Sequence, residues 1–309
     1  MKNILITGIH GFVGSNFVEA LKDNHTIYGL DIIFPEKEGV EKTFSWNELN
    51  KTPKTNAIIH LAGKAHDTKD ESLAQSYFDI NTELTKKIFD YFLQSDAEAF
   101  IFFSSVKAAA DVVESNFLTE DVEPKPVGAY GESKIKAEEY IQSKDWSGKK
   151  VYILRPAMIY GVGNKGNLNL LYNLVKKGIP WFLGAFENNR SFCSINNISY
   201  VAAQLIQKQD IPSGIYHIAD DEALSTNELI ELICESVGKK PRIWYTPKKM
   251  VNTMAAIGTA LRLPLNIFRL QKLTENYVVS NEKIKQALHI SKMPFSAKEE
   301  FINTFKSFQ

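Results

Sequence analysis

Short apolar runs alternate with stretches of helical periodicity through the first half of the chain. Parallel strands covered by helices on both faces produce this alternation, because a crossover helix must join each strand to the next. The pattern predicts strands over residues 3–7, 26–31, 57–61, 99–104 and 151–155, and helices over residues 14–23, 73–93 and 129–142.

The rhythm changes after Arg155 and Pro156. Gly and Asn cluster over residues 161–167, and mixed segments follow, with helices predicted over residues 168–177 and 226–237. We therefore expect an α/β fold made of a doubly wound parallel sheet (a Rossmann domain) and a smaller substrate lobe of mixed α/β structure. The predicted bounds are 1–157 for the sheet domain, with a returning segment near 192–210, and 158–309 for a discontinuous substrate lobe.

Charge and composition exclude several classes of partner. Lys plus Arg and Asp plus Glu number 36 each, so no overall charge attracts nucleic acid. Two cysteines, Cys193 and Cys234, are too few for a disulfide framework or a Cys-rich metal site, so we expect no metal and a cytoplasmic setting. The most apolar segment, residues 250–268, is interrupted by polar residues and predicts a buried or interfacial helix, with contact at a membrane surface as the alternative.

The first apolar run leads into a turn with a glycine at every third position. Gly8 permits the tight turn, Gly11 lets the backbone approach a pyrophosphate, and Gly14 allows close packing of the following helix. Phe12 and Val13 begin that helix, whose free N–H groups and dipole favour the negative charge of phosphates. A glycine turn between a strand and a helix predicts a dinucleotide cofactor.

An acidic residue closes the second predicted strand. Asp31 can accept hydrogen bonds from the adenosine ribose hydroxyls and would repel a 2′-phosphate. Neither Ile32 nor Ile33, which follow it, is an Arg that would accommodate that phosphate. The cofactor is therefore predicted to be NAD, with Ile32 among its contacts; the alternative is an Asp31 that merely caps a turn.

Candidate catalytic groups lie on one helix and at one strand end. Tyr130 and Lys134 are four residues apart, so both side chains lie on one face of the predicted helix. The ammonium can stabilise a phenolate and hold the nicotinamide ribose, which permits acid–base chemistry near neutral pH. Ser104 and Ser105 follow a strand, at the edge where doubly wound sheets bind ligands, and a hydroxyl there can orient a substrate toward Tyr130. A helix-surface pair and a turn cap are the alternatives.

In order and spacing, these motifs resemble those of the extended short-chain dehydrogenases/reductases, in the NAD-dependent sugar epimerase/dehydratase family. The resemblance covers nearly the whole chain and extends to His60-Leu61-Ala62-Gly63, Asn81, Leu154-Arg155-Pro156 and Tyr160-Gly161. It implies that Ser105, Tyr130 and Lys134 form the catalytic triad. The further cofactor contacts that it implies are Leu61, Ala62, Gly63, Asn81, Ser104, Tyr130, Lys134 and Pro156.

The chain departs from the family pattern beside the catalytic serine. Val106 and Lys107 stand where the dehydratases of the family have Asp-Glu, which argues against 4,6-dehydration. Ala109 and Ala110 replace the usual Tyr-Gly, and Met158 stands where many relatives carry Asn, which puts one substrate contact in doubt. Lys107 either touches the substrate or is a loop lysine.

Two later segments resemble those that bind nucleotide sugars in the family. The first is Asn167-Leu168, after the Gly-rich loop, and the second is residues 188–192. In members of the family, an Asn and an Arg at the corresponding places hold the diphosphate of a UDP-sugar, and Arg is suited to bidentate bonds with phosphate. An ion pair is the alternative role for Arg190. A second Arg often closes the site, for which Arg262 and Arg269 are candidates. The expected substrate contacts are Lys64, Ser105, Lys107, Tyr130, Asn167, Leu168, Arg190 and Arg269.

The resemblance implies an NAD-dependent nucleotide-sugar 4-epimerase of the UDP-hexose or UDP-N-acetylhexosamine type, acting through a transient 4-keto sugar. The alternatives are an NAD(P)H-dependent 4-reductase of a UDP-4-keto-6-deoxy-sugar, an epimerase of a polyprenyl-diphosphate sugar, and a catalytically silent NAD-binding protein. The expected partner is a nucleotide sugar, UDP-linked, with no nucleic acid and no membrane contact. The family also implies a homodimer formed through the helices over residues 73–93 and 129–142.

Overall fold

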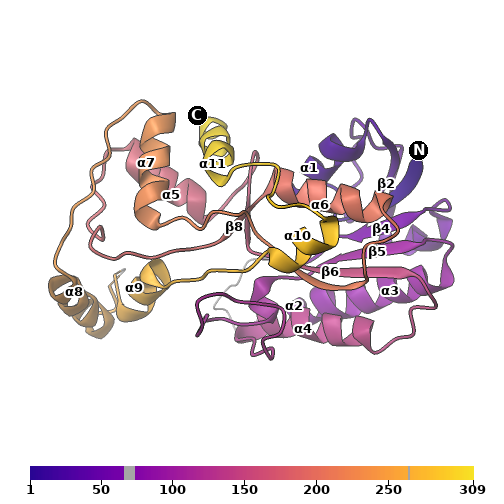
Figure 1. Ribbon diagram of the computed structural model, residues 1–309, viewed down its shortest axis with the longest axis horizontal. Helices are drawn as coiled ribbons and strands as arrows, with labels where there is room; N and C mark the ends of the chain where they lie inside the picture. The colour runs from indigo at the N-terminus through magenta and orange to yellow at the C-terminus, as the bar shows by residue number, and fades with distance from the viewer. Residues whose placement is uncertain (66–73, 264) are drawn as a thin grey trace.

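Seven parallel strands form one sheet, six of them from residues 2–156 and the seventh from residues 214–218 (Figure 1). The computed structural model describes residues 1–65, 74–263 and 265–309. The strand order is β3-β2-β1-β4-β5-β6-β9. From β1 the chain adds strands first on one side (β2, β3) and then on the other (β4 onward), so the doubly wound fold is confirmed. The strands are β1 (Lys2–Thr7), β2 (His25–Asp31), β3 (Lys42–Ser45), β4 (Ala57–His60), β5 (Ala99–Phe103), β6 (Lys150–Pro156) and β9 (Gly214–Ile218).

Helices cover both faces of the sheet (Figure 1). Side chains alternate along each strand, so Ile4 and Ile6 of β1 enter one core while Leu5 enters the other. Both faces must therefore be covered, and the central strands β4 and β5 are buried along their whole length. The first core lies against α1 (Phe12–Leu21), α6 (Ile195–Gln207) and α10 (Glu282–Leu288), and the second against α3 (Leu84–Gln94) and α4 (Gly128–Gln142).

The helix expected over residues 73–93 is not regular along its length. Residue 73 lies outside the described residues, and from there the chain forms α2 (Ala74–Tyr77), a π-helical turn (Phe78–Glu83) and α3. The wide turn carries Asn81 and Thr82 toward α4, where the Thr82 hydroxyl donates to the Ser133 carbonyl oxygen at 2.8 Å. Such turns are frequent at functional sites, and apolar periodicity alone does not reveal them.

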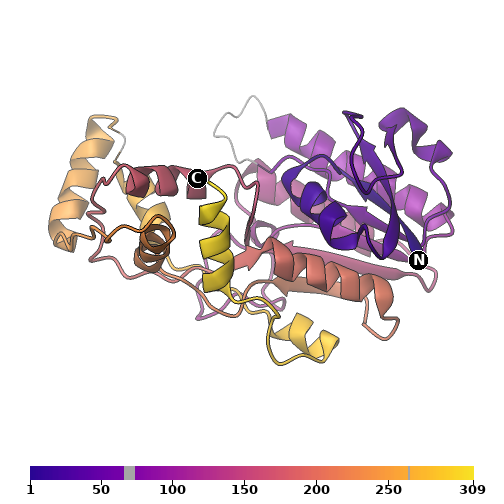
Figure 2. The ribbon, with the colours of Figure 1, turned by 90° about the horizontal axis from the view of Figure 1, so that it is seen from above.

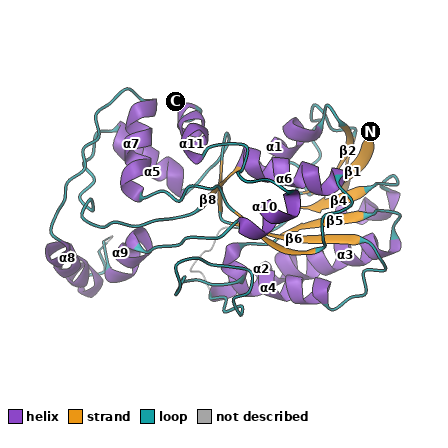
Figure 3. Cartoon of the chain, viewed as in Figure 1, coloured by secondary structure: helices purple, strands orange, loops and turns teal. Residues whose placement is uncertain are grey.

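A second lobe follows β6, and helices and loops dominate it (Figure 3). Its short parallel pair is β7 (Met158–Tyr160) with β8 (Phe192–Ser194), packed with α5 (Asn167–Lys176), α7 (Thr226–Ser236) and α11 (Ala297–Lys306). The predicted helices over residues 168–177 and 226–237 are confirmed as α5 and α7. At the centre of this lobe the Phe301 ring stacks on Tyr160, with ring centroids 3.7 Å apart.

Strand β3, helix α6 and strand β9 of the sheet lobe were not predicted as elements. Strand β3 has four residues at the sheet edge, where burial is incomplete and no alternation can be read. After β8 the chain returns through α6 to β9, which extends the sheet to Ile218, beyond the returning segment near 192–210.

The single helix predicted over residues 250–268 is wrong. The structure has two helices there, α8 (Lys248–Ala260) and α9 (Ile267–Thr274), which we call the hairpin. Figure 2 shows it at the end of the molecule far from the sheet. Val251 and Ala255 are buried against Leu270, but other apolar side chains of the hairpin face outward. Among the helices of the described residues, none combines the length and the apolar composition that crossing a membrane requires.

We predict that Phe301→Ala destabilises the protein by about 3–5 kcal/mol, because it removes a fully buried ring that contacts both Tyr160 and Phe192. Urea denaturation gives the free energy of unfolding. Phe295→Ala is the matched control, since 40% of that side chain is exposed, and it should cost less than about 1 kcal/mol. Equal losses in the two variants would show that α11 does not depend on this ring.

Candidate active site

The glycine turn after β1 brings backbone atoms closer together than any side chain would allow. Gly8 has φ +68°, and a Cβ added to it would lie 3.0 Å from the backbone of Ala62 at the end of β4. A Cβ on Gly14 would collide with the Gly8 carbonyl oxygen. Gly11 is the N-cap of α1 and provides no side-chain cap, so the first N–H groups of Phe12 and Val13 remain open to a ligand. This backbone cradle fits the diphosphate of a dinucleotide.

The carboxylate of Asp31 is held beside this cradle by backbone donors. His10 N–H donates to Asp31 Oδ2 at 2.9 Å, and Ile32 N–H donates to Oδ1 at 2.7 Å. Asp31 therefore does cap the turn, yet each oxygen keeps a further acceptor site for a ribose hydroxyl. The side chain of Ile32 is exposed beside it.

The end of β4 and the π-helical turn meet beside α4. Asn81 accepts from Lys64 N–H at 2.8 Å and donates to the Lys64 carbonyl oxygen at 3.1 Å, which fixes the loop after β4. A Cβ on Gly63 would lie 3.0 Å from Asn81 Oδ1 and 3.2 Å from Lys134 Nζ. Of the predicted cofactor contacts, Leu61, Ala62, Gly63 and Asn81 thus lie around the Lys134 ammonium and the glycine turn. Pro156 is buried at the end of β6.

The proposed triad lies where β5 ends against α4. Lys134 Nζ donates to the Phe103 carbonyl oxygen at 2.7 Å, which fixes the ammonium beside Ser104 and Ser105. The Ser105 hydroxyl accepts from Lys107 N–H at 3.2 Å as the cap of a short helix over residues 106–108. Tyr130 stands one helical turn before Lys134, with its ring edge-on to Tyr77 at 6.4 Å. The structure therefore brings Ser105 and Lys134 to one edge of the sheet, with Tyr130 one helical turn before Lys134 on α4.

A buried ion pair supports this arrangement from beneath, and sequence reasoning missed it. Arg155 of β6 donates to Glu138 of α4 through Nε, at 3.0 and 3.1 Å, and through Nη2, at 2.6 Å. The Ser104 hydroxyl also donates to Glu138. Both charged side chains are almost fully buried. Glu138 follows Lys134 by one helical turn, so the four-residue spacing that joins Tyr130 and Lys134 was the available signal.

Burial lowers the proton affinity of the Lys134 side chain. Removal from water lowers the pKa of Lys134 to about 8, and the nearby Glu138 carboxylate opposes that shift. With a pKa of about 8 the side chain is mostly an ammonium at neutral pH, and Glu138 favours that charged form.

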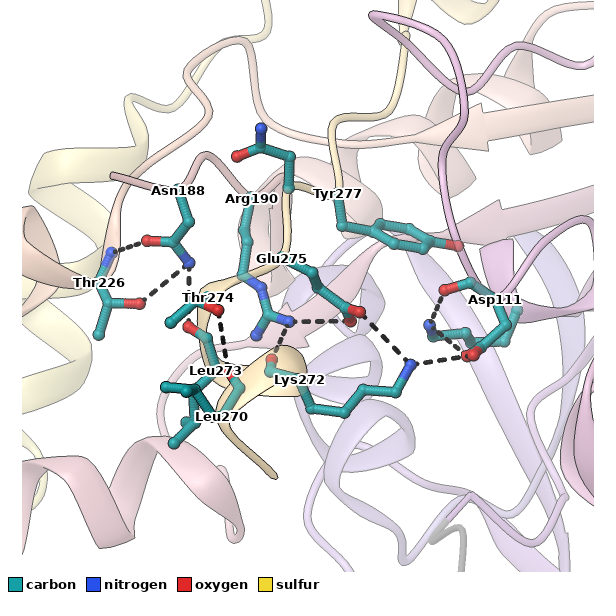
Figure 4. Close-up of polar contacts among 12 residues, drawn as sticks. Asp111, Asn188, Arg190, Thr226, Leu270, Lys272, Leu273, Thr274, Glu275 and Tyr277 are labelled. Atoms are coloured by element: carbon teal, nitrogen blue, oxygen red, sulfur yellow. Dashed lines mark hydrogen bonds and ion pairs between the residues drawn. The ribbon is translucent and has the colours of Figure 1, made fainter. Parts of the chain in front are cut away.

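A chain of alternating charges links the loop after β5 to the hairpin (Figure 4). Lys107 Nζ lies 2.9 Å from Asp111 Oδ1, and Lys272 Nζ of α9 lies 2.9 Å from Asp111 Oδ2. Lys272 also pairs with Glu275 at 3.5 Å, and Glu275 pairs with Arg190 at 3.3 Å. The Lys107 ammonium also lies 4.4 Å from the ring centroid of Tyr277, so two side chains of the protein hold it in place.

The other predicted substrate residues are more scattered. Arg190 forms the ion pair given above as its alternative role and donates to the Lys272 carbonyl oxygen at 2.6 Å; burial lowers its pKa. Asn167 is exposed at the start of α5, whereas the Leu168 side chain belongs to the core of the second lobe. Arg269 is exposed on α9, and Arg262 lies between the two helices of the hairpin. The binding roles of these residues remain predictions.

Among the described residues, no three His, Cys, Asp or Glu side chains gather in a group that could hold a metal ion.

The comparisons with known proteins agree with this geometry. Residues 4–219 match the model of the NAD dependent epimerase/dehydratase family. The chain is 31% identical to a UDP-glucose 4-epimerase of Vibrio cholerae over 266 residues, which cover 80% of this chain and 78% of that protein. It is 27% identical, over 79% of this chain and 75% of the other, to the N-acetyl-alpha-D-glucosaminyl-diphospho-ditrans,octacis-undecaprenol 4-epimerase of Escherichia coli O157:H7.

Solved structures share the fold at lower identity. The UDP-glucuronic acid 4-epimerase of Bacillus cereus in complex with NAD superposes with a TM-score of 0.75 at 19% identity, covering 99% of this chain and 98% of that one. The chain belongs to the NAD dependent epimerase/dehydratase family. It is an enzyme of the extended short-chain dehydrogenase/reductase type, and its cofactor is NAD.

We predict that removing the Glu138 charge shifts the alkaline limb of the pH–kcat profile to lower pH. Without that carboxylate the pKa of Lys134 falls further below about 8, so the ammonium is lost earlier as the pH rises. Glu138→Gln alone leaves Arg155 buried and unpaired, which costs about 3–5 kcal/mol of stability.

The double variant Glu138→Gln/Arg155→Met removes both buried charges, and it keeps the test valid if the single variant does not fold. Circular dichroism and NAD titration check its integrity. An unshifted alkaline limb in this folded variant would contradict the role assigned to Glu138.

Proposed function

We propose that the protein is a nucleotide-sugar 4-epimerase acting on a UDP-hexose or UDP-N-acetylhexosamine. The observation that carries the proposal is the gathering of Ser105, Tyr130 and Lys134 at the strand edge beside the dinucleotide cradle. The similarity to the Vibrio cholerae UDP-glucose 4-epimerase supports the reaction and the nucleotide.

Each catalytic side chain then has one task. Tyr130, as phenolate, accepts the proton of the sugar C4 hydroxyl, and it returns a proton to the C4 oxygen at the end of the cycle. Ser105 holds that hydroxyl toward Tyr130, and the Lys134 ammonium stabilises the phenolate through its positive charge. NAD, when bound, supplies the acceptor and then the donor of the C4 hydride. A 4-keto sugar that presents its opposite face before reduction gives the inverted C4 centre.

The charged chain of Figure 4 is the proposed contact for the diphosphate. Lys107, Lys272 and Arg190 provide three cations, against the two carboxylates of Asp111 and Glu275. A diphosphate would compete with those carboxylates for the cations, and the Arg190 guanidinium is suited to bind it at two points. This arrangement favours a substrate with a diphosphate over a neutral sugar.

We predict that Tyr130→Phe lowers kcat by at least about a thousandfold, because the proton acceptor is lost while the ring remains. NAD affinity should change less than about threefold, since the cradle at Gly8, Gly11 and Gly14 is intact. Product formation from UDP-sugars, read by NMR of the C4 centre, and NAD titration measure the two effects. A fully active Tyr130→Phe enzyme would overturn the mechanism.

The epimerase and the alternative 4-reductase differ in their use of the cofactor. An epimerase regenerates NAD in each cycle, so the purified protein should convert many equivalents of UDP-sugar without added cofactor. An absolute requirement for fresh NADH or NADPH in every turnover would contradict the epimerase and support the reductase. A screen of UDP- and dTDP-sugars under both conditions separates these outcomes and identifies the sugar.

A further inference from the structure

The hairpin carries two separate apolar stripes. Val251 and Ala255 of α8 pack inward on Leu270 of α9, and Gly258 lies so close to the Leu265 carbonyl oxygen that a Cβ would collide with it. This inner stripe holds the two helices together. The other apolar side chains of α8, which we call the outer stripe, are exposed on the surface of this packed pair of helices.

The outer stripe follows one line along α8. Met250, Met254, Ile257 and Leu261 are spaced by four, three and four residues, which places them on a single helical face. They are exposed, Ile257 by 52% and Leu261 by 65%. Near the start of α9, Ile267 and Phe268 are about half exposed and continue the apolar character of the hairpin. An exposed apolar stripe of this kind is typical of an interaction surface.

The charge around the outer stripe identifies its partner. Residues 236–274 contain no acidic residue, whereas the chain as a whole is neutral, so the rest of the chain has a net charge of −8. The eight basic residues of this segment are Lys239, Lys240, Arg242, Lys248, Lys249, Arg262, Arg269 and Lys272. Lys248 and Lys249 are exposed at the start of α8 and Arg262 just beyond its end, so cations flank the stripe at both ends.

We propose that the outer stripe of the hairpin docks on the surface of an anionic phospholipid bilayer. Apolar side chains on one face of a helix, with cations at its flanks, are what an interfacial helix needs to bury its side chains between acyl chains and neutralise headgroups. The sequence of residues 250–268 left contact at a membrane surface as the alternative, and the proposal takes up that alternative for the outer stripe. The proposal does not depend on the identity of the sugar.

The position of the hairpin ties this surface to the active site. Helix α9 carries Lys272, whose ammonium reaches Asp111 in the loop after β5 at 2.9 Å. Docking would therefore hold the proposed diphosphate contacts close to the bilayer surface, whereas the sheet and its dinucleotide cradle lie toward the other end of the molecule (Figure 2).

The test is co-sedimentation of the full chain with vesicles. Vesicles of phosphatidylcholine with phosphatidylglycerol should bind the protein, vesicles of phosphatidylcholine alone should bind it at least about tenfold more weakly, and high salt should release it. The variant Ile257→Glu/Leu261→Glu should lose binding by at least about tenfold, because it places charge in the outer stripe, which docking would bury among the acyl chains. Lys248→Gln/Lys249→Gln should weaken binding to the anionic vesicles and leave the weak binding to neutral vesicles unchanged.

Matched controls lie on other surfaces. Leu170→Glu, on α5, changes a side chain that is 64% exposed, and Lys298→Gln/Lys306→Gln changes two cations of α11; neither should alter vesicle binding. Turnover of a water-soluble UDP-sugar should stay within about twofold in Ile257→Glu/Leu261→Glu, so the failure of either proposal is seen separately from the other.

Three results would overturn the docking proposal. The first is equal binding to neutral and anionic vesicles, or none to either. The second is an equal loss of binding in Leu170→Glu. The third combines two observations: the parent protein does not bind vesicles, and sedimentation equilibrium shows that it is a dimer whereas Ile257→Glu/Leu261→Glu is a monomer. That result would assign the stripe to a second copy of this chain.

Discussion

The carboxylate of Glu138 lies out of water between the Arg155 guanidinium and the Ser104 hydroxyl, one helical turn after Lys134 on α4. Removing two charges from water is costly, and the pair is tolerated because its geometry is bidentate and Ser104 takes up a further acceptor site. The three residues come from α4, β6 and the end of β5. Any displacement of α4 along the sheet would break these bonds together, so Tyr130 and Lys134 are held in register with Ser105.

The same constraint links structure to proton chemistry. Burial alone would favour a neutral Lys134, and the anionic Glu138 offsets part of that tendency from one helical turn away. The Lys134 ammonium is fixed by a backbone carbonyl oxygen and lies against Gly63, where no side chain intervenes. The site thus combines a dry, preorganised cation with a backbone surface that accepts a ligand, which is the electrostatic arrangement that stabilises developing negative charge.

Local signals predicted much of this structure. The five apolar runs are strands whose ends differ from the prediction by no more than one residue, because buried parallel strands impose continuous apolar sequence. The glycine turn was predicted because its three constraints lie within a few residues. Partnerships between distant residues were not accessible: Glu138 and Arg155 are 17 residues apart and Asp111 and Lys272 are 161 apart, and they meet only when helices pack. The hairpin was mistaken for one helix because apolar residues continue across its turn, although Asn266, whose side chain caps α9 by accepting from Arg269 N–H, is a typical helix-start residue.

We propose that the C4 centre is oxidised and reduced again within the site, with the hydrogen of C4 leaving and returning as hydride. The conversion of a UDP-sugar deuterated at C4, followed by mass spectrometry and NMR of the product, tests this proposal. We expect the deuterium to remain at C4 of the inverted product, with no solvent hydrogen entering there. Loss of the label to water would mean that C4 is deprotonated as an acid, and it would rule out hydride transfer at C4.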